Sequence, residues 1–180
     1  MKFSIFDWLD ESGGGRAETY DERLRLLEYA DAAGFTGYLL AEHHGTSLST
    51  IPSPSIFLSA AAARTGRLRL GALTWLLPAY NPVRLLAALC MLDQLSRERL
   101  ELGIGRGSSP HEVARHGVSG EEARARFEQV PALLLMGFTK CELRFQGRHY
   151  RYDSVAIRFR TVRNPHRPPW FPTSNVESIP

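Results

Sequence analysis

The sequence predicts an α/β fold built on a parallel sheet of about five strands with a small hairpin insertion. The clearest unit is residues 71–107, GALTWLLPAYNPVRLLAALCMLDQLSRERLELGIGRG. An apolar run over 68–77 is typical of a buried strand, leucines recur at helical spacing over 85–95, and residues 100–105 alternate at the strand period. Such strand–helix–strand units are almost always parallel and right-handed. The same alternation continues along the chain.

The first sixty residues predict two strands with a helix between them. Residues 2–8 are a short apolar strand that ends at an Asp-Trp pair. Thr19 and Glu22 fit a capping box, which predicts a helix that begins at Thr19. Gly34 closes that helix, and residues 36–41 form the second strand.

The middle of the chain predicts two further helices. Pro54 opens an alanine-rich helix that runs to about residue 65. Asn81 and Pro82 supply an N-cap and a first-turn proline for the leucine-rich helix. Residues 108–118 are expected to form a loop or a short helix.

The last third predicts a helix, a hairpin and a fifth strand. Ser119 and Glu122 form a second capping box, so a helix should run to about residue 137, with a kink at Pro131. The alternating stretches FQGRHYRY and VAIRFR, within 145–160, suggest the hairpin. Residues 170–174 are the expected fifth strand.

Length and composition are those of a globular domain. The 180 residues are 43% hydrophobic and 23% charged, with 2 cysteines. No apolar run approaches the roughly 20 residues that span a bilayer, and the N-terminus turns acidic too early for a signal peptide. These features predict a single domain over residues 1–180, a cytoplasmic location and no membrane partner.

Basic residues are concentrated in the second half of the chain. Residues 144–167 hold seven arginines against one acidic residue, Asp153. A nucleic-acid surface would explain this stretch, but no recognition motif accompanies it. We therefore expect a solvated face, or one that meets acidic neighbours, and no nucleic-acid partner.

Polar residues follow each predicted barrel strand. They are Asp7–Trp8, Glu42–His44, Leu73–Trp75, Gly105–Gly107 and Thr173–Asn175. Carboxyl ends of parallel strands meet at one face, where barrel enzymes carry their catalytic groups. These side chains are therefore expected to share one cleft.

Residues 92–107, LDQLSRERLELGIGRG, resemble the LDxLSxGRxxxGxGRG signature of the bacterial luciferase-like flavin monooxygenases. Pro78 and the run Asn81–Arg84 match the approach to that helix. The resemblance implies a partial TIM-type (β/α) barrel, apparently truncated after the fifth strand. One departure is Glu98, where the family has glycine; a positive φ there would cost about 1 kcal/mol.

The resemblance also implies a site. The EHH motif makes His43 the expected catalytic residue and Glu42 a cofactor neighbour, while His44 is expected to be structural. The alternative for His43 is a histidine hydrogen-bonded in a polar loop. Leu73 and Thr74 match the position of a non-proline cis peptide under the flavin ring. No metal site is expected, because adjacent residues on a strand point apart and no third ligand has a recognisable spacing.

Two further segments complete this expected site. Arg106 matches the family arginine that meets the flavin phosphate or ring; the alternative is a surface salt bridge. Gly105 replaces the reactive cysteine of luciferase itself, so no thiol chemistry is expected. The segment PPWFPTSNVES resembles the family's fifth-strand segment and gives Thr173 and Ser174 as phosphate ligands.

The implied function is oxygenation of an organic substrate by O₂ and reduced FMN, with the flavin supplied by a separate reductase. One alternative is hydride transfer with the deazaflavin F420 on the same fold. Another is a truncated, non-catalytic homologue that binds flavin or a partner. A sheet with two apolar edges, residues 2–8 and 170–174, also predicts a homo- or hetero-oligomer.

Overall fold

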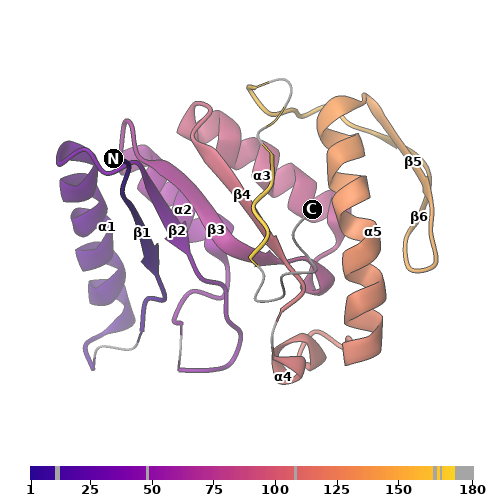
Figure 1. The fold of residues 1–180 in the computed structure, drawn as a ribbon, viewed down its shortest axis with the longest axis horizontal. Helices are drawn as coiled ribbons and strands as arrows, with labels where there is room; N and C mark the ends of the chain where they lie inside the picture. Colours follow the sequence, from indigo (N-terminus) through magenta and orange to yellow (C-terminus); the bar gives the residue numbers. More distant parts are fainter. Residues whose placement is uncertain (11–12, 48, 108, 164–165, 167, 173–180) are drawn as a thin grey trace.

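The computed structural model describes residues 1–10, 13–47, 49–107, 109–163, 166 and 168–172. Strands and helices alternate through most of the chain (Figure 1). In chain order the elements are β1 (Ser4–Asp7), α1 (Arg16–Ala32), β2 (Gly37–Leu40), α2 (Pro54–Arg64), β3 (Arg69–Leu76), the 3₁₀ turn η1 (Leu77–Ala79), α3 (Pro82–Ser96), β4 (Leu100–Gly105), α4 (Pro110–Ala114), α5 (Gly120–Thr139), β5 (Glu142–Gln146) and β6 (Arg151–Ala156).

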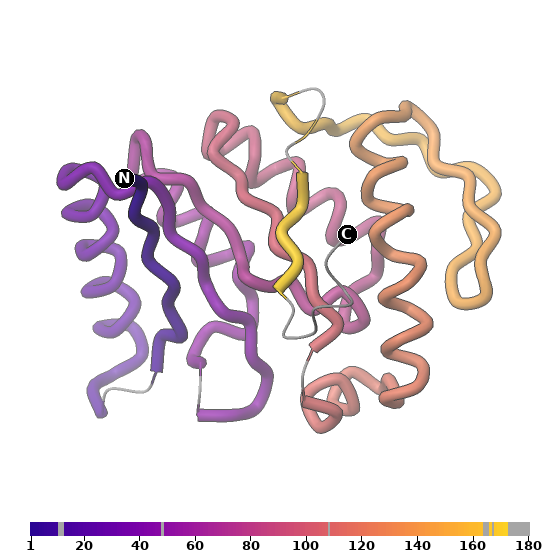
Figure 2. The backbone as a smooth tube through the Cα atoms, viewed as in Figure 1, coloured from indigo at the N-terminus to yellow at the C-terminus, as the bar shows by residue number. Residues whose placement is uncertain are grey.

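The sheet is parallel, in the order β1-β2-β3-β4. Trp170 extends it with an isolated parallel bridge to Gly103. The Trp170 amide donates to the Leu102 carbonyl, and the Trp170 carbonyl accepts from the Ile104 amide. Figure 2 shows this late segment, in yellow, returning alongside β4. The bridge lies at the first residue of the predicted fifth strand. Residues 171–172 are not in a strand, and residues 173–174 lie outside the described residues. The partial barrel is therefore confirmed.

The hydrophobic core lies between this sheet and its helices. It joins Leu27 of α1, Leu58 of α2 and Leu89 of α3 to Tyr38 and Leu70 of the sheet, all of them fully buried. Alternate strand residues therefore face the helices, as the period of a strand requires. The leucine-rich helix buries its predicted face except at Leu95, which is exposed.

Three of the four predicted helix starts are confirmed, and α2 begins at Pro54 as expected. Asn81 accepts hydrogen bonds from the backbone of Val83 and Arg84, and Ser119 accepts one from the backbone of Glu122. The predicted cap at Thr19 is wrong: α1 begins at Arg16, so Thr19 is already helical. Its hydroxyl donates back to the Gly15 carbonyl, as threonines within helices often do.

The turn before β4 has positive φ angles, including at Glu98, where the family has glycine. Arg97 and Glu98 have φ angles of 54° and 65°. Glu98 therefore adopts the left-handed conformation that favours glycine. The two residues lie at the end of α3, and the Glu98 amide donates a hydrogen bond to the Asp93 carbonyl of that helix.

The hairpin is present, but its strands begin earlier than predicted. Phe145 pairs with Tyr152 and Gln146 with Arg151, so the turn lies at residues 147–150. The alternation of the sequence did not reveal that Gly147 donates to the Tyr150 carbonyl and closes the turn there. The hairpin packs on α5, which continues through Pro131 without a break (Figure 1).

Candidate active site

A cleft of about 770 Å³ opens at the carboxyl ends of the parallel strands. Seven segments line it: the end of β1, the segment after β2, the second half of β3, the end of β4 with the loop after it, α4, α5 and residues 171–172. The lining residues are Phe6, Trp8, Ala41, Glu42, His43, Leu73, Thr74, Leu76, Gly105, Arg106, Gly107, Glu112, Arg124, Phe127, Glu128, Phe171 and Pro172. Most predicted positions that the structure describes share this cleft. Asp7, His44 and Trp75 do not line it: Asp7 accepts from the Tyr38 hydroxyl, His44 contacts Glu42, and Trp75 is buried in the core.

His43 reaches the cleft directly after β2. Its side chain is 17% exposed, and its Nδ1 lies 2.9 Å from Oε1 of Glu112. The indole of Trp8 lies against the imidazole, with ring centroids 5.0 Å apart. The ring is thus held on one side by a carboxylate and on another by an aromatic surface.

Glu42 is a structural carboxylate that forms part of the wall. It is 2% exposed and accepts hydrogen bonds from the Leu76 amide at 3.0 Å and the Tyr80 hydroxyl at 2.7 Å. His44 contacts the same carboxylate through Nε2 at 2.7 Å. Burial, together with the nearby carboxylate, raises the pKa of Tyr80. Glu42 therefore lines the cleft with both oxygens already engaged.

His44 and His116 form a pair beside this carboxylate. Their rings meet edge to face, with centroids 4.4 Å apart. Burial lowers the pKa of His116, and the neighbouring His44 lowers it further. His44 thus packs between Glu42 and His116, which agrees with the structural part expected of it.

Leu73 and Thr74 of β3 line the cleft. Their peptide bond is cis, as the resemblance implies, and the pairing of β3 with β4 shifts register between Ala72 and Trp75. Thr74 lies close to the neighbouring strand: a Cβ added at Gly105 would come 2.0 Å from the Thr74 hydroxyl oxygen. A side chain at position 105 would therefore require Thr74 of β3 to shift.

Arg106 follows β4 and is exposed at the cleft. Within the described part of the chain, its guanidinium has no hydrogen bond or ion pair. The surface salt bridge considered from the sequence is therefore not formed there. Thr173 and Ser174 lie outside the described residues, but their neighbours Phe171 and Pro172 line the cleft.

Sequence reasoning missed three contributions to this site. Glu112 comes from α4, a five-residue helix in a stretch expected to be a loop or short helix. Arg124 and Phe127 come from α5, and Phe127 contacts Phe171 with ring centroids 5.6 Å apart. No motif marks these residues, since they reach the cleft through the path of the chain after β4.

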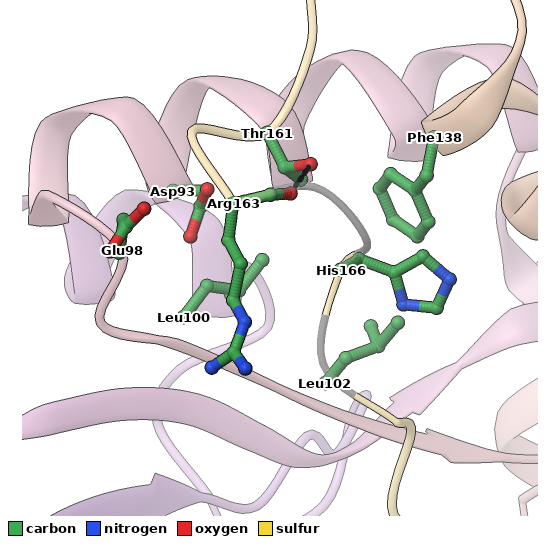
Figure 3. A pocket seen from close by; sticks show the side chains of 8 residues that line it. All are labelled: Asp93, Glu98, Leu100, Leu102, Phe138, Thr161, Arg163 and His166. Atoms are coloured by element: carbon green, nitrogen blue, oxygen red, sulfur yellow. Dashed lines mark hydrogen bonds between the residues drawn. The ribbon is translucent and has the colours of Figure 1, made fainter.

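A much smaller cavity, of about 20 Å³, lies beside the start of β4 (Figure 3). Leu100, Leu102, Asp93, Glu98, Phe138, Thr161, Arg163 and His166 line it. In Figure 3 the His166 ring faces that of Phe138, and their centroids are 4.9 Å apart. A space of this size holds about one water molecule, so it offers no site for an organic ligand.

The described residues contain neither a membrane-spanning helix nor a cluster of metal-binding side chains. None of the helices is long and apolar enough to cross a membrane. In the same residues, no group of three or more histidine, cysteine, aspartate or glutamate side chains could hold a metal ion.

The sequence matches the luciferase-like monooxygenase family over residues 1–179, and the chain belongs to that family. It is 41% identical to an uncharacterised protein, y4wF, of Sinorhizobium fredii, over 99% of the chain and 52% of the relative. It is 27% identical to the oxygenase component of a flavin-dependent trigonelline monooxygenase of Acinetobacter baylyi, over 94% of the chain and 48% of the relative.

The crystal structure of the monooxygenase RslO1 from Streptomyces bottropensis superposes on the chain with a TM-score of 0.88 at 33% identity. The match covers 95% of this chain and 52% of that one. The chain therefore spans about half the length of the relatives it matches.

Proposed function

We propose that the cleft binds reduced FMN and that the protein oxygenates an organic substrate with O₂. One observation carries the proposal: His43, Leu73, Thr74 and Arg106, which come from β3 and from the segments that follow β2 and β4, line a single cleft. Carboxyl ends of parallel strands are where barrel enzymes build such sites. When bound, the flavin supplies the oxygen chemistry, and the protein binds and shields it.

The residues of the cleft fit a flavin. Its volume, about 770 Å³, lies within the range of small-molecule sites. The aromatic rings of Trp8, Phe127 and Phe171 give it apolar walls suited to a planar ring system. Arg106 offers a cation that no described residue neutralises, as an anionic phosphate requires.

Each predicted residue has a proposed part. Arg106 binds the phosphate or the ring, and the hydroxyls of Thr173 and Ser174 bind the phosphate. The Leu73–Thr74 segment supports one face of the ring. His43 holds or moves a proton at Nε2, the ring nitrogen that lacks a partner among the described residues. Glu42 shapes the pocket through its bonds to Leu76 and Tyr80 rather than by direct contact.

The test is a spectral titration of the protein with FMN and with F420, followed by oxygen-consumption measurements with reduced FMN. We expect FMN binding at micromolar concentration and oxygen uptake that depends on an added organic substrate. Binding of F420 in place of FMN, without oxygen uptake, would favour hydride transfer instead. Binding of FMN without turnover would leave the non-catalytic alternative.

We also propose that a flavin reductase supplies the reduced cofactor and that the chain associates with itself or with another subunit. β1 is an edge strand, and Phe3, Phe6 and Trp8 around it are 60%, 48% and 39% exposed. Trp170 and Phe171 are similarly exposed at the other edge. Exposed apolar edges promote association. Light scattering on the purified 180-residue chain should detect a species larger than 20.2 kDa; a monodisperse monomer with a cooperative melt would contradict this.

A further inference from the structure

Glu112 is a buried carboxylate that the proposed chemistry does not yet use. It is 3% exposed and lies in α4, 69 positions along the chain from the histidine it contacts. A buried charged group normally requires a partner. Among the described residues, the side chain of Glu112 has a single polar partner, Nδ1 of His43.

This contact determines which nitrogen of His43 carries the proton. An ionised carboxylate only accepts hydrogen bonds, so Nδ1 must be the donor. In the neutral ring, Nε2 then keeps its lone pair. Trp8 lies against the ring, with centroids 5.0 Å apart, and restricts its rotation. The ring is therefore both oriented and held in one tautomer.

Glu112 is itself held in place. Its neighbour Val113 packs with Val118 and Ala123 in a small buried cluster. At the end of the same helical turn, Arg115 donates to the Gly45 carbonyl at 3.2 Å. Two contacts, Glu112 to His43 and Arg115 to Gly45, thus join α4 to the segment that follows β2.

His44 provides an internal contrast. Its Nε2 contacts Glu42, and its ring packs against His116. The nitrogen that His43 leaves open is therefore the one that His44 has engaged. Of these adjacent histidines, only His43 lines the cleft.

We propose that Glu112 is a positioning residue that fixes the Nδ1–H tautomer of His43 and presents an unprotonated Nε2 to the cleft ligand. The role of His43 rests on the proposed function, but the tautomer does not. Glu112 acts through His43 and need not touch the ligand.

The first test reads the tautomer directly. Two-bond ¹H–¹⁵N correlation spectra of the protein, at about pH 8.5 where histidines are normally neutral, report the proton on each ring nitrogen. His43→Asn identifies the signals of residue 43. We expect the Nδ1–H form in the wild type and a change to mainly Nε2–H in Glu112→Ala. The isosteric Glu112→Gln keeps the volume and should give an intermediate population.

Glu121→Gln is the matched control, because it removes an exposed carboxylate at the start of the neighbouring helix, away from His43. Its spectrum should equal that of the wild type. An unchanged His43 tautomer in both Glu112 variants would overturn the proposal. The isosteric Glu112→Gln keeps the side-chain volume, so the test remains valid if Glu112→Ala fails to fold.

The second test separates this inference from the proposed function. With FMN and a turned-over substrate, Glu112→Ala should lower kcat about ten- to a hundredfold, the range for partners that orient histidines in metal sites, with FMN affinity unchanged. A changed tautomer with unchanged kcat would overturn the positioning role alone. Absence of FMN binding by the wild type would contradict the proposed function and leave the tautomer result standing.

Discussion

The two ends of the parallel sheet use their charged residues differently. At the amino end, Arg99 is buried and donates four hydrogen bonds inside the protein. Its guanidinium donates to the carbonyls of Ser96, Leu68 and Ala62 and to the hydroxyl of Thr65. These bonds join the starts of β3 and β4 to the ends of α2 and α3.

Other charges at the amino end are also satisfied internally. Asp31 accepts hydrogen bonds from the backbone amides of Gly66, Arg67 and Leu68. Arg69 pairs with Glu101, which also accepts from the Trp170 indole. This end therefore holds the strands in register.

At the carboxyl end, one cation and one histidine nitrogen have no partner among the described residues. Arg106 has no partner among the described residues, and Nε2 of His43 is open. A cation or a nitrogen lone pair without a protein partner is available to a ligand. The difference agrees with barrel enzymes in general, where one face of the sheet serves stability and the other serves chemistry.

The largest effect should come from the amino end. Arg99→Ala removes hydrogen bonds from a charged donor and leaves buried carbonyls unpaired, so the free energy of unfolding should fall by about 3 kcal/mol or more. Thermal unfolding measures this, with exposed Arg84→Ala as the control. An Arg99→Ala protein as stable as the control would contradict the claim that the charged residues at the amino end of the sheet stabilise the fold.

His43→Ala should have the next largest effect, on rate alone. Loss of the proposed proton-transfer group should lower turnover about 10²-fold, equivalent to about 2.7 kcal/mol, with FMN binding and melting temperature nearly unchanged. His43→Asn, which can keep a donor toward Glu112 but lacks Nε2, should be equally slow. Exposed His111→Ala in α4 serves as control. An equal loss of binding and rate would indicate a structural role.

Arg106→Ala should weaken FMN binding by about 1.5 to 3 kcal/mol, the range for a hydrogen bond to a charged group. Arg106→Lys should recover part of this, because the charge remains while the planar fork is lost. Arg148→Ala, an exposed arginine in the hairpin turn, is the control. Unchanged FMN affinity in Arg106→Ala would remove Arg106 from the site.

Local features of the sequence predicted part of the site. Strand ends are local features, so His43, Leu73, Thr74 and Arg106 could be assigned to one cleft from periodicity and the parallel-sheet rule. The Asn81 N-cap could also be predicted, because it depends only on neighbouring residues. The GIGRG strand end and the EHH motif identified the residues, and the fold brings them together.

Partners from distant elements could not be predicted. Glu112 is 69 positions from His43 and Arg99 is 34 from Thr65, and neither pair follows from the period of a helix or a strand. The Thr19 cap failed because the sequence T-x-x-E also occurs inside a helix, where threonine bonds to the preceding turn. Long-range contacts thus decide both the site geometry and some element boundaries.

The smallest effect should come from Asp31, which tests whether the charges of the amino end serve stability. Burial acts to raise the pKa of this carboxyl, but the backbone amides of Gly66, Arg67 and Leu68 outweigh it and hold the pKa below its ordinary value. The folded state therefore binds this proton less readily than the unfolded chain. The resulting stability is present above the ordinary carboxyl pKa and is lost as the pH falls through the lowered value.

Asp31→Asn should consequently lower the free energy of unfolding by about 1 kcal/mol at neutral pH, since the amide oxygen still accepts but carries no charge. The difference from the wild type should begin to narrow as the pH falls below about 4, where the Asp31 carboxyl of the unfolded chain gains its proton. Urea unfolding at pH 7 and at pH 3 measures it, with exposed Asp10→Asn as the control. A difference that stays constant between the two pH values would mean that the charge of Asp31 contributes nothing and that its hydrogen bonds act as neutral ones.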